Sequence, residues 1–382
     1  MMADDPMTVT FTYEDAVKEY KNFYAPAYEL KIGSMEIDET NKPANIQVDG
    51  IRVEIAMGDM AGCASFDIIN AYDQKNSKFN EEIINALQLG EKVEVSLGYG
   101  SALTLVFKGY ISSISTSFST GGLPTLSVYC MDVTGLMRDN ERDEQATESK
   151  DYIEVVKEML GASIYTPYLS AEDMKITAQD SSGGGSTTGG EGALSISHST
   201  NDLLYLESLA REIGYEFFVV AGKFYFRPIT NKAESPITHL KWGSSLMSFS
   251  RELIMRVQVC KVKVIGKGLQ TTERIEAEAV ATKADSERTK KPGEGTTKII
   301  RDETIRTQAD AKKRADAELE ELRKKSFGGN CSCIGLPKLV PGRYIDISGL
   351  SGELNATYYI RSVSHNLGSG GFTTTFEVGM DR

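Results

Sequence analysis

Three histidines, His198, His239 and His365, are the only imidazole groups in the 382 residues of the chain. None of them lies in an H-E-x-x-H segment, and the sequence has no G-x-S-x-G elbow and no Walker-type glycine loop. His365 closes a strand-like pattern, where an isolated histidine is usually a hydrogen-bonded structural residue. These residues predict no catalytic site and no cofactor.

Cys331-Ser-Cys333 is the closest cysteine pair, and with Cys130 or His365 it could in principle complete a zinc site. Structural zinc sites usually separate their paired cysteines by two to four residues, so a separation of one residue is a poor match. Five cysteines in so long a chain also do not form a disulfide framework. We therefore expect buried thiols and no metal.

Asp139, Glu141 and Asp143 have the spacing of the first three ligands of a calcium loop. The sixth position is Glu144, where the sharp turn needs glycine, and the twelfth is Lys150, where a bidentate glutamate belongs. A solvated acidic loop is the better interpretation of this segment.

The segment Gly98-Tyr-Gly100 follows a strand pattern, as a dinucleotide-binding turn would. The pattern that follows it, residues 103–107, is again a strand and not a helix, so this interpretation fails. Dispersed Asp and Glu pairs could serve a cell-wall glycosidase. The chain leaves no room for an additional lysozyme-like domain, and we predict that it is not an enzyme.

The composition is that of a folded, acidic protein. The chain has 40% apolar and 25% charged residues, and 42 basic against 54 acidic side chains give a net charge of −12. Nucleic acid is a disfavoured main ligand because phosphate binding depends on a basic surface. Residues 1–20 lack the pattern of a signal peptide and no apolar segment has transmembrane length, so we expect cytoplasmic synthesis and no membrane insertion.

Residues 1–25 are predicted to form an N-terminal arm with a short helix. Thr12 can cap this helix with Asp15 three residues later, and Pro26 ends it. One face carries the candidate partner-binding residues Tyr13, Val17, Tyr20 and Tyr24. So short a helix is marginal in water by itself. It should bind another protein or fold back on its own first domain, and the sequence leaves both alternatives open.

The rest of the chain divides into three regions, as expected for its length. Residues 26–135 alternate apolar and polar side chains and should be mostly β. Residues 136–245 combine helical patterns from Ser149 and Thr200 with a hairpin around Ala221-Gly222, and they contain a Gly/Ser-rich loop at 181–192.

Residues 246–382 are predicted to be β-rich again. A strand pattern at 257–265 is followed by a charged stretch at 269–295 without clear periodicity. A helix at 307–325 follows, and three strand patterns close the chain. The apolar stripe of this helix looks too narrow for deep burial, and its members are Ala311, Ala315, Leu319 and Leu322.

Four segments of the chain carry a family resemblance. They are FKGYISSI at 107–114, NDLLYLESLAREIGYEF at 201–217 with GKFYFR at 222–227, the charged helix at 309–324 leading into GLPKLVPG at 335–342, and YYIRSVSH at 358–365 with GFTTTFEV at 371–378. In their order and spacing they resemble the late control protein D and VgrG-like hub proteins of contractile phage tails and injection systems. The resemblance spans residue 26 to the C-terminus.

The resemblance implies two β-barrels similar to the tail tube subunit, at 26–135 and 246–382, flanking a smaller α+β region. Three subunits would then present six barrels to a hexameric tube, while the other end of the trimer holds a trimeric spike. VgrG continues into an oligosaccharide-binding barrel and a β-helical needle, which this sequence lacks before Arg382. The resemblance therefore implies that the spike is a separate protein.

The family thus implies a structural hub in the baseplate of a phage tail, tailocin or extracellular injection system, assembled in a bacterial cytoplasm. The expected partners are two further copies of the chain, the tail tube protein, the spike, other baseplate proteins, and a tape measure protein or cargo. The alternative is a baseplate-associated enzyme that degrades peptidoglycan.

Overall fold

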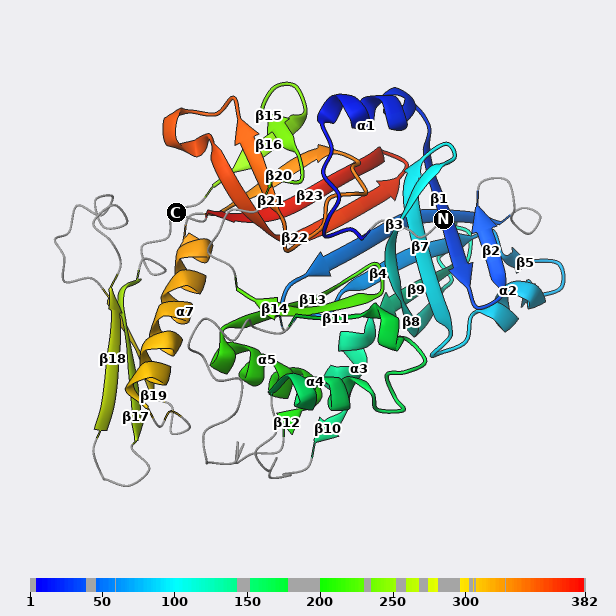
Figure 1. Cartoon of the computed structure of the whole chain (residues 1–382). Coiled ribbons are helices and arrows are strands. Elements are labelled where there is room, and N and C mark those ends of the chain that lie inside the picture. Colours follow the sequence, from blue (N-terminus) through cyan, green and yellow to red (C-terminus); the bar gives the residue numbers. More distant parts are fainter. Residues whose placement is uncertain are drawn as a thin grey trace.

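The structure of the chain is a computed structural model (Figure 1). It describes residues 5–38, 46–58, 60–142, 152–177, 200–229, 235–251, 259–267, 274–280, 296–301, 305, 307–326 and 328–380. The Gly/Ser-rich loop at 181–192, His198 and Asp143 lie outside these residues.

The fold is mostly β, as the sequence predicts, and one 13-stranded sheet dominates it. Its first region contains β1 (Pro26–Ile32), β2 (Met35–Asp38), β3 (Gln47–Ala56), β4 (Cys63–Ile69), β7 (Lys92–Tyr99), β8 (Ala102–Ser117) and β9 (Thr125–Met131). The short β5 (Tyr72–Asp73), β6 (Lys78–Phe79) and α2 (Glu81–Ala86) lie between β4 and β7. The second region contains β15 (His239–Lys241), β16 (Leu246–Ser250), β20 (Gly329–Ile334), β21 (Tyr344–Ser348), β22 (Ala356–Gly368) and β23 (Gly371–Met380).

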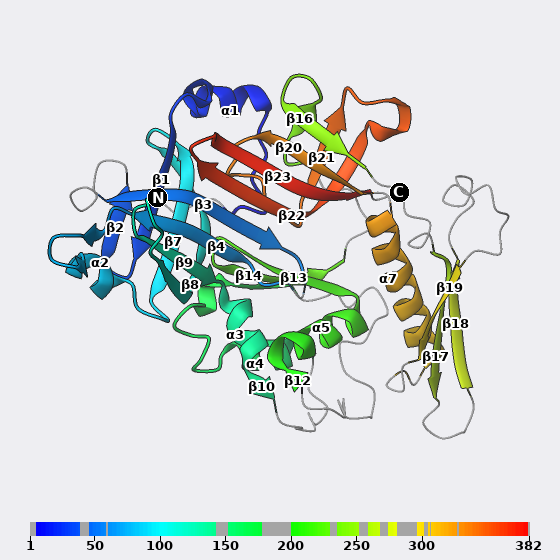
Figure 2. The same cartoon turned by 180° about the vertical axis from the view of Figure 1, so that it is seen from behind.

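The two β regions are neighbours in this sheet, although residues 132–238 separate them in sequence. The strand order is β16-β20-β23-β22-β3-β4-β9-β8-β7-β1-β2, with β21 pairing β22 and β15 pairing β21. β22 and β3 join the two regions through an antiparallel ladder from Ser362 opposite Ala56 to Leu367 opposite Ile51. Both regions also contribute to one hydrophobic core. Figure 2 shows β22 and β3 side by side from behind.

A second core forms under the sheet, where helices pack against a hairpin. Its elements are α3 (Val133–Asp139), β10 (Glu141–Arg142), α4 (Tyr152–Leu160), β11 (Met174–Ile176), β12 (Thr200–Asn201), α5 (Asp202–Ile213), β13 (Tyr215–Val220) and β14 (Lys223–Pro228). Asn201 caps α5, and Gly214 ends it in the left-handed conformation. Ala221 and Gly222 both have positive φ, as a two-residue hairpin turn requires. The predicted helix and hairpin are confirmed.

A third core lies to one side of the molecule, where α7 (Gln308–Ser326) covers a small sheet (Figure 1). The sheet consists of β17 (Val259–Lys267), β18 (Arg274–Val280) and β19 (Thr296–Arg301). The sequence interpretation missed β18, which lies within the charged stretch. Its charged side chains pair with those of β17, as in Lys261 with Glu278 at 2.7 Å.

The prediction that the stripe of this helix is not deeply buried is wrong. Ala311 and Ala315 are fully buried and Leu319 is 7% exposed. The alanines let α7 approach β17 and β18 closely, and so a narrow stripe is enough to close this small core.

Candidate assembly surfaces

The N-terminal arm forms the predicted helix, α1 (Tyr13–Glu19), with a complete capping box between Thr12 and Asp15. Tyr20 follows the helix and is 1% exposed, and its ring centroid lies 5.4 Å from that of Tyr99 on β7. Burial raises the pKa of the Tyr20 phenol to about 12. Tyr20 is therefore part of the main core of its own chain.

The other predicted arm residues lie at different depths. Tyr13 and Val17 are half-buried, and Tyr13 packs against the main core. Tyr24 is 89% exposed. Of the two alternatives for the arm, folding back on its own chain describes the observed packing. Binding of a partner stays a prediction, and Tyr24 is the residue that remains accessible for it.

Polar contacts attach the arm to distant parts of the chain. The Arg343 guanidinium is buried and donates from Nη1 to the carbonyl oxygens of Met7 at 2.7 Å and Val9 at 2.9 Å. Asp5 accepts a hydrogen bond of 2.6 Å from the Tyr225 hydroxyl on β14, and Lys338 forms an ion pair with Glu19 at 2.6 Å. The arm thus holds the second β region and the hairpin together.

His365 lies within the main sheet, on β22, and is fully buried. Its Nδ1 lies 3.0 Å from the Thr374 hydroxyl on β23, and burial lowers the pKa of the imidazole from 6.5 to about 4. This geometry fits a neutral structural histidine.

In the unfolded chain His365 binds a proton with its ordinary pKa of 6.5, whereas in the folded chain burial lowers this pKa to about 4. The folded state therefore loses stability relative to the unfolded state as pH falls from 6.5 towards 4. Between pH 7 and 4.5 the loss should be about 2–3 kcal/mol. We expect a His365→Gln variant to lose that much less stability than the wild type over this range. Urea unfolding at both pH values measures the difference, and equal losses would contradict the assignment.

Cys331 and Cys333 point into the core from β20, and both are buried. Burial raises the pKa of the Cys331 thiol to about 12 and that of Cys333 further. Metal ligation needs the thiolate, which this environment disfavours. Within the residues that the structure describes, no group of three His, Cys, Asp or Glu side chains could hold a metal ion.

The fold does not bring the remaining candidate residues from the sequence together into one site. Asp139 ends α3 and Glu141 begins β10, while His239 is exposed on β15 with its Nε2 2.8 Å from the Ser348 hydroxyl. Gly98 belongs to the hairpin of β7 and β8, where an added Cβ would lie 2.0 Å from the Ala102 carbonyl oxygen. Gly98 thus allows the two strands to approach each other closely, and it does not belong to a phosphate-binding turn.

Asp132 is a buried carboxyl group, and its burial raises its pKa to about 6. Such a group is a candidate general acid. Asp132, however, accepts hydrogen bonds from the backbone N–H of Gly62 at 3.1 Å and of Thr134 at 2.9 Å, and it caps α3. These contacts give it a structural role in joining α3 to the sheet.

A polar network joins the hairpin to the second β region. Arg227 on β14 donates from Nε to Glu216 on β13 at 2.9 Å and from Nη2 to the Gly342 carbonyl at 2.5 Å. The Tyr359 hydroxyl on β22 donates to the same Glu216 carboxylate at 2.7 Å. The side chains of Arg227 and Glu216 are only 15% and 12% exposed. This buried ion pair holds the second core against the main sheet.

The main sheet has open edges within the described part of the chain. β16 pairs only with β20, and residues 113–117 of β8 pair only with β9. Two large apolar side chains are exposed at the first edge, Met247 on β16 and Trp242 in the turn before it, at 62% and 54%. Neither residue was predicted from the sequence as a candidate surface residue, although Trp242 is the single tryptophan of the chain.

No helix in the described ranges is long and apolar enough to cross a membrane.

Solved structures with the same fold come from phage tails and a secretion system. A tail protein from Neisseria meningitidis superposes with a TM-score of 0.68 at 14% identity, covering 94% of this chain and 97% of that one. A 43 kDa tail protein of prophage MuSo2 from Shewanella oneidensis gives 0.62 at 15%, covering 93% and 98%. An Escherichia coli component of the type VI secretion system, described as structurally similar to the phage T4 tail proteins gp27 and gp5, gives 0.54 at 12%, covering 91% and 76%.

The superpositions show that these proteins share the fold of this chain, although their sequences are only 12–15% identical to it. A search of curated protein sequences found no match. A family model described as the Alg8 N-terminal domain matches residues 29–369, which is most of the chain. The chain therefore belongs to the Alg8 N-terminal domain family.

Proposed function

We propose that the chain is a structural hub of a contractile phage tail, tailocin or extracellular injection system, as its resemblance to late control protein D and VgrG implies. Three copies would form a trimer that matches a hexameric tube to a trimeric spike. Support comes from the fold, which is shared with phage tail proteins and a type VI secretion component.

The observation that carries this proposal is the ladder between β22 and β3. It places the two β regions side by side in one sheet, so each copy offers two adjacent β units. Three such copies around a three-fold axis would offer six units, the number that a six-fold tube needs. We keep 1–25, 26–135, 136–245 and 246–382 as the proposed domain boundaries, with β15 as a strand that precedes residue 246 and pairs with β21 of the second β region.

The open edges are our proposed contacts between copies. An exposed strand edge pairs readily with another chain, and proteins usually cover or blunt it. β16 of one copy could continue the sheet of its neighbour at residues 113–117 of β8. This contact would join two different surfaces of neighbouring copies. Repeated contacts of this kind form a closed ring when the rotation from one copy to the next returns to the first copy.

The proposed partners beyond the trimer are the tube protein, a separate spike, other baseplate proteins, and a tape measure protein or cargo. The net charge of −12 favours a lumen that does not retain nucleic acid. Assembly would occur in the bacterial cytoplasm, and the finished chain would reside in the baseplate.

We propose no enzymatic activity and no cofactor. The alternative, a baseplate enzyme that degrades peptidoglycan, would need a pair of carboxyl groups in a cleft. The Asp132 carboxyl group, whose pKa is raised, is instead engaged in capping α3. Zymography distinguishes the two functions, because clearing of peptidoglycan by the purified chain would support the enzyme.

A charge at the β16 edge should weaken the proposed trimer. We expect Met247→Lys to shift the purified chain from trimer towards monomer in sedimentation velocity, because the lysine would have to be desolvated in the contact. Met60, between β3 and β4, is also 62% exposed, so Met60→Lys is the matched control and should leave the trimer intact. Equal oligomeric states for the two variants would count against this edge as the contact.

A further inference from the structure

A cavity of about 260 Å³ lies where the three cores meet. β3 leaves the main sheet after Ala56, and Met57 then pairs with Phe218 on β13. The Gly58 N–H donates to the Phe217 carbonyl oxygen at 3.0 Å, which fixes this crossing. The walls of the cavity come from α5, β13, α7 and β22.

Arg361 on β22 lines this cavity, and a β-bulge sets its position. The register between β22 and β23 shifts between Ile360 and Ser362, so Arg361 is the extra residue. Bulges redirect a side chain and are frequent beside functional sites. Arg361 is half-buried as a whole residue, and its guanidinium has no hydrogen bond or ion pair with the residues that the structure describes.

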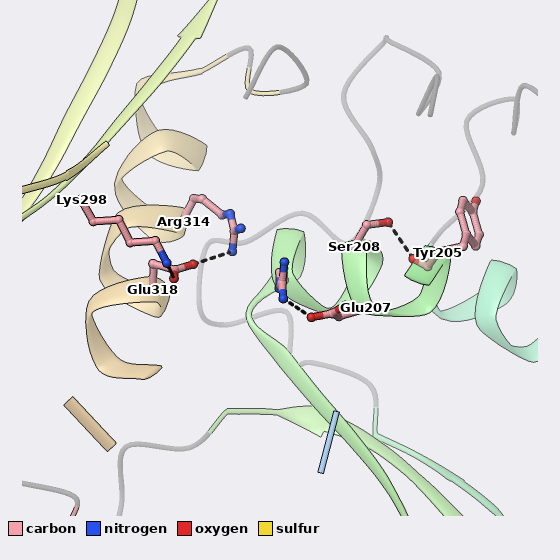
Figure 3. A network of polar contacts seen from close by, with 7 residues as sticks. Tyr205, Glu207, Ser208, Lys298, Arg314 and Glu318 are labelled. Atoms are coloured by element: carbon pink, nitrogen blue, oxygen red, sulfur yellow. Dashed lines mark hydrogen bonds and ion pairs between the residues drawn. The ribbon is translucent and has the colours of Figure 1, made fainter. Parts of the chain in front are cut away.

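The other charged groups around the cavity are already engaged. On α5, Arg211 pairs with Glu207, and on α7, Arg314 lies 3.7 Å from Glu318 (Figure 3). Glu318 is 9% exposed and also pairs with Lys298 on β19 at 2.5 Å. Figure 3 shows Lys298, Arg314 and Glu318 gathered at α7, and Glu207 on the neighbouring α5.

The charged side chains that line the cavity are three arginines, Arg361, Arg211 and Arg314, and three carboxylates, Glu207, Glu216 and Glu318. Each carboxylate already has a cationic partner, because Glu207 pairs with Arg211, Glu216 with Arg227, and Glu318 with Arg314 and Lys298. Among the described residues, Arg361 is therefore the cation of the lining whose charge is not compensated by a pair. Partial burial strengthens the attraction of such a site for an anion.

We propose that this cavity binds an anionic group, a phosphate or a carboxylate, with Arg361 as its main contact. A guanidinium offers two parallel N–H donors to either group. Met57, Phe217 and Ile229 add apolar surface to the lining, which suits the carbon atoms that carry a carboxylate or phosphate. The site rests on the cavity and not on the proposed hub function.

Calorimetric titration of the full chain with inorganic pyrophosphate and, separately, with a tri-glutamate peptide tests the proposal. At least one probe should bind saturably. Arg361→Gln should weaken that binding at least tenfold, and Arg361→Lys less. Arg52→Gln is the matched control, because Arg52 is an exposed arginine on β3 that pairs with Glu54, and it should bind like the wild type.

Circular dichroism melting of each variant verifies folding, and Arg211→Gln provides a second test if Arg361→Gln does not fold. Binding of pyrophosphate alone identifies a free phosphate as the ligand, and binding of the peptide alone identifies a protein carboxylate. Saturable binding of neither probe by the wild type, or equal affinity in Arg361→Gln and Arg52→Gln, would overturn the site.

Discussion

Replacing Tyr20 by alanine is expected to lower the free energy of unfolding by about 3–5 kcal/mol, the range for removal of a buried aromatic ring. The ring is 1% exposed and lies against Tyr99 and Phe23, so its loss would leave a cavity between the arm and the main sheet. Chemical denaturation of the purified chain measures this loss directly.

Tyr24→Ala is the matched control, since it removes the same side chain from a position that is 89% exposed. Its effect on stability should stay within about 0.5 kcal/mol. If this variant folds normally but fails to enter particles, Tyr24 is the part of the arm that binds a partner. A Tyr20→Ala variant as stable as Tyr24→Ala would show that the arm does not belong to the core of its own chain.

Breaking the Arg227–Glu216 ion pair should have an effect of similar size. Arg227→Met leaves the Glu216 carboxylate largely buried beside Tyr359 without its cation, and removal of one partner of a buried pair typically costs about 3–5 kcal/mol. We expect a corresponding fall in the midpoint of urea unfolding.

The control is the double variant Arg227→Met with Glu216→Leu. Replacing both members of a buried pair by apolar groups of similar size is often neutral or stabilising. The double variant should therefore recover most of the lost stability. A double variant less stable than Arg227→Met alone would mean that the hydrogen bond from the Tyr359 hydroxyl to Glu216 contributes more than the unpaired carboxylate costs, because Arg227 is absent from both variants.

Local features of this fold follow from the sequence because neighbouring residues determine them. The capping box at Thr12 and the turn at Ala221-Gly222 depend on a few adjacent residues, and both were predicted. Strand alternation in β7, β8 and β9 is equally local.

The junctions could not be predicted in the same way. The pairing of β22 with β3 joins residues about three hundred positions apart, and neither strand carries a local signal for its partner. β18 was missed because its charged side chains match those of β17, a match visible only once the strands are adjacent. The burial of α7 depends on how closely alanine permits a sheet to approach, which periodicity does not reveal.

The candidate binding surfaces likewise combine local features, which the sequence predicts, with long-range contacts, which it does not. The aromatic face of the arm was recognised from its spacing, but the residues that hold it were not, because Arg343 and Tyr99 come from remote segments. Arg361 has no motif around it, and its importance arises from a bulge and from the meeting of three cores. Long-range geometry therefore determines most of the candidate binding groups.

The hub function is tested most directly by counting copies of this chain in purified particles by cryo-electron microscopy. We predict three copies around the three-fold axis at the baseplate end of the tube, each placing both β regions against the hexameric ring. Six copies per ring, or a position away from the tube axis, would contradict the proposed function.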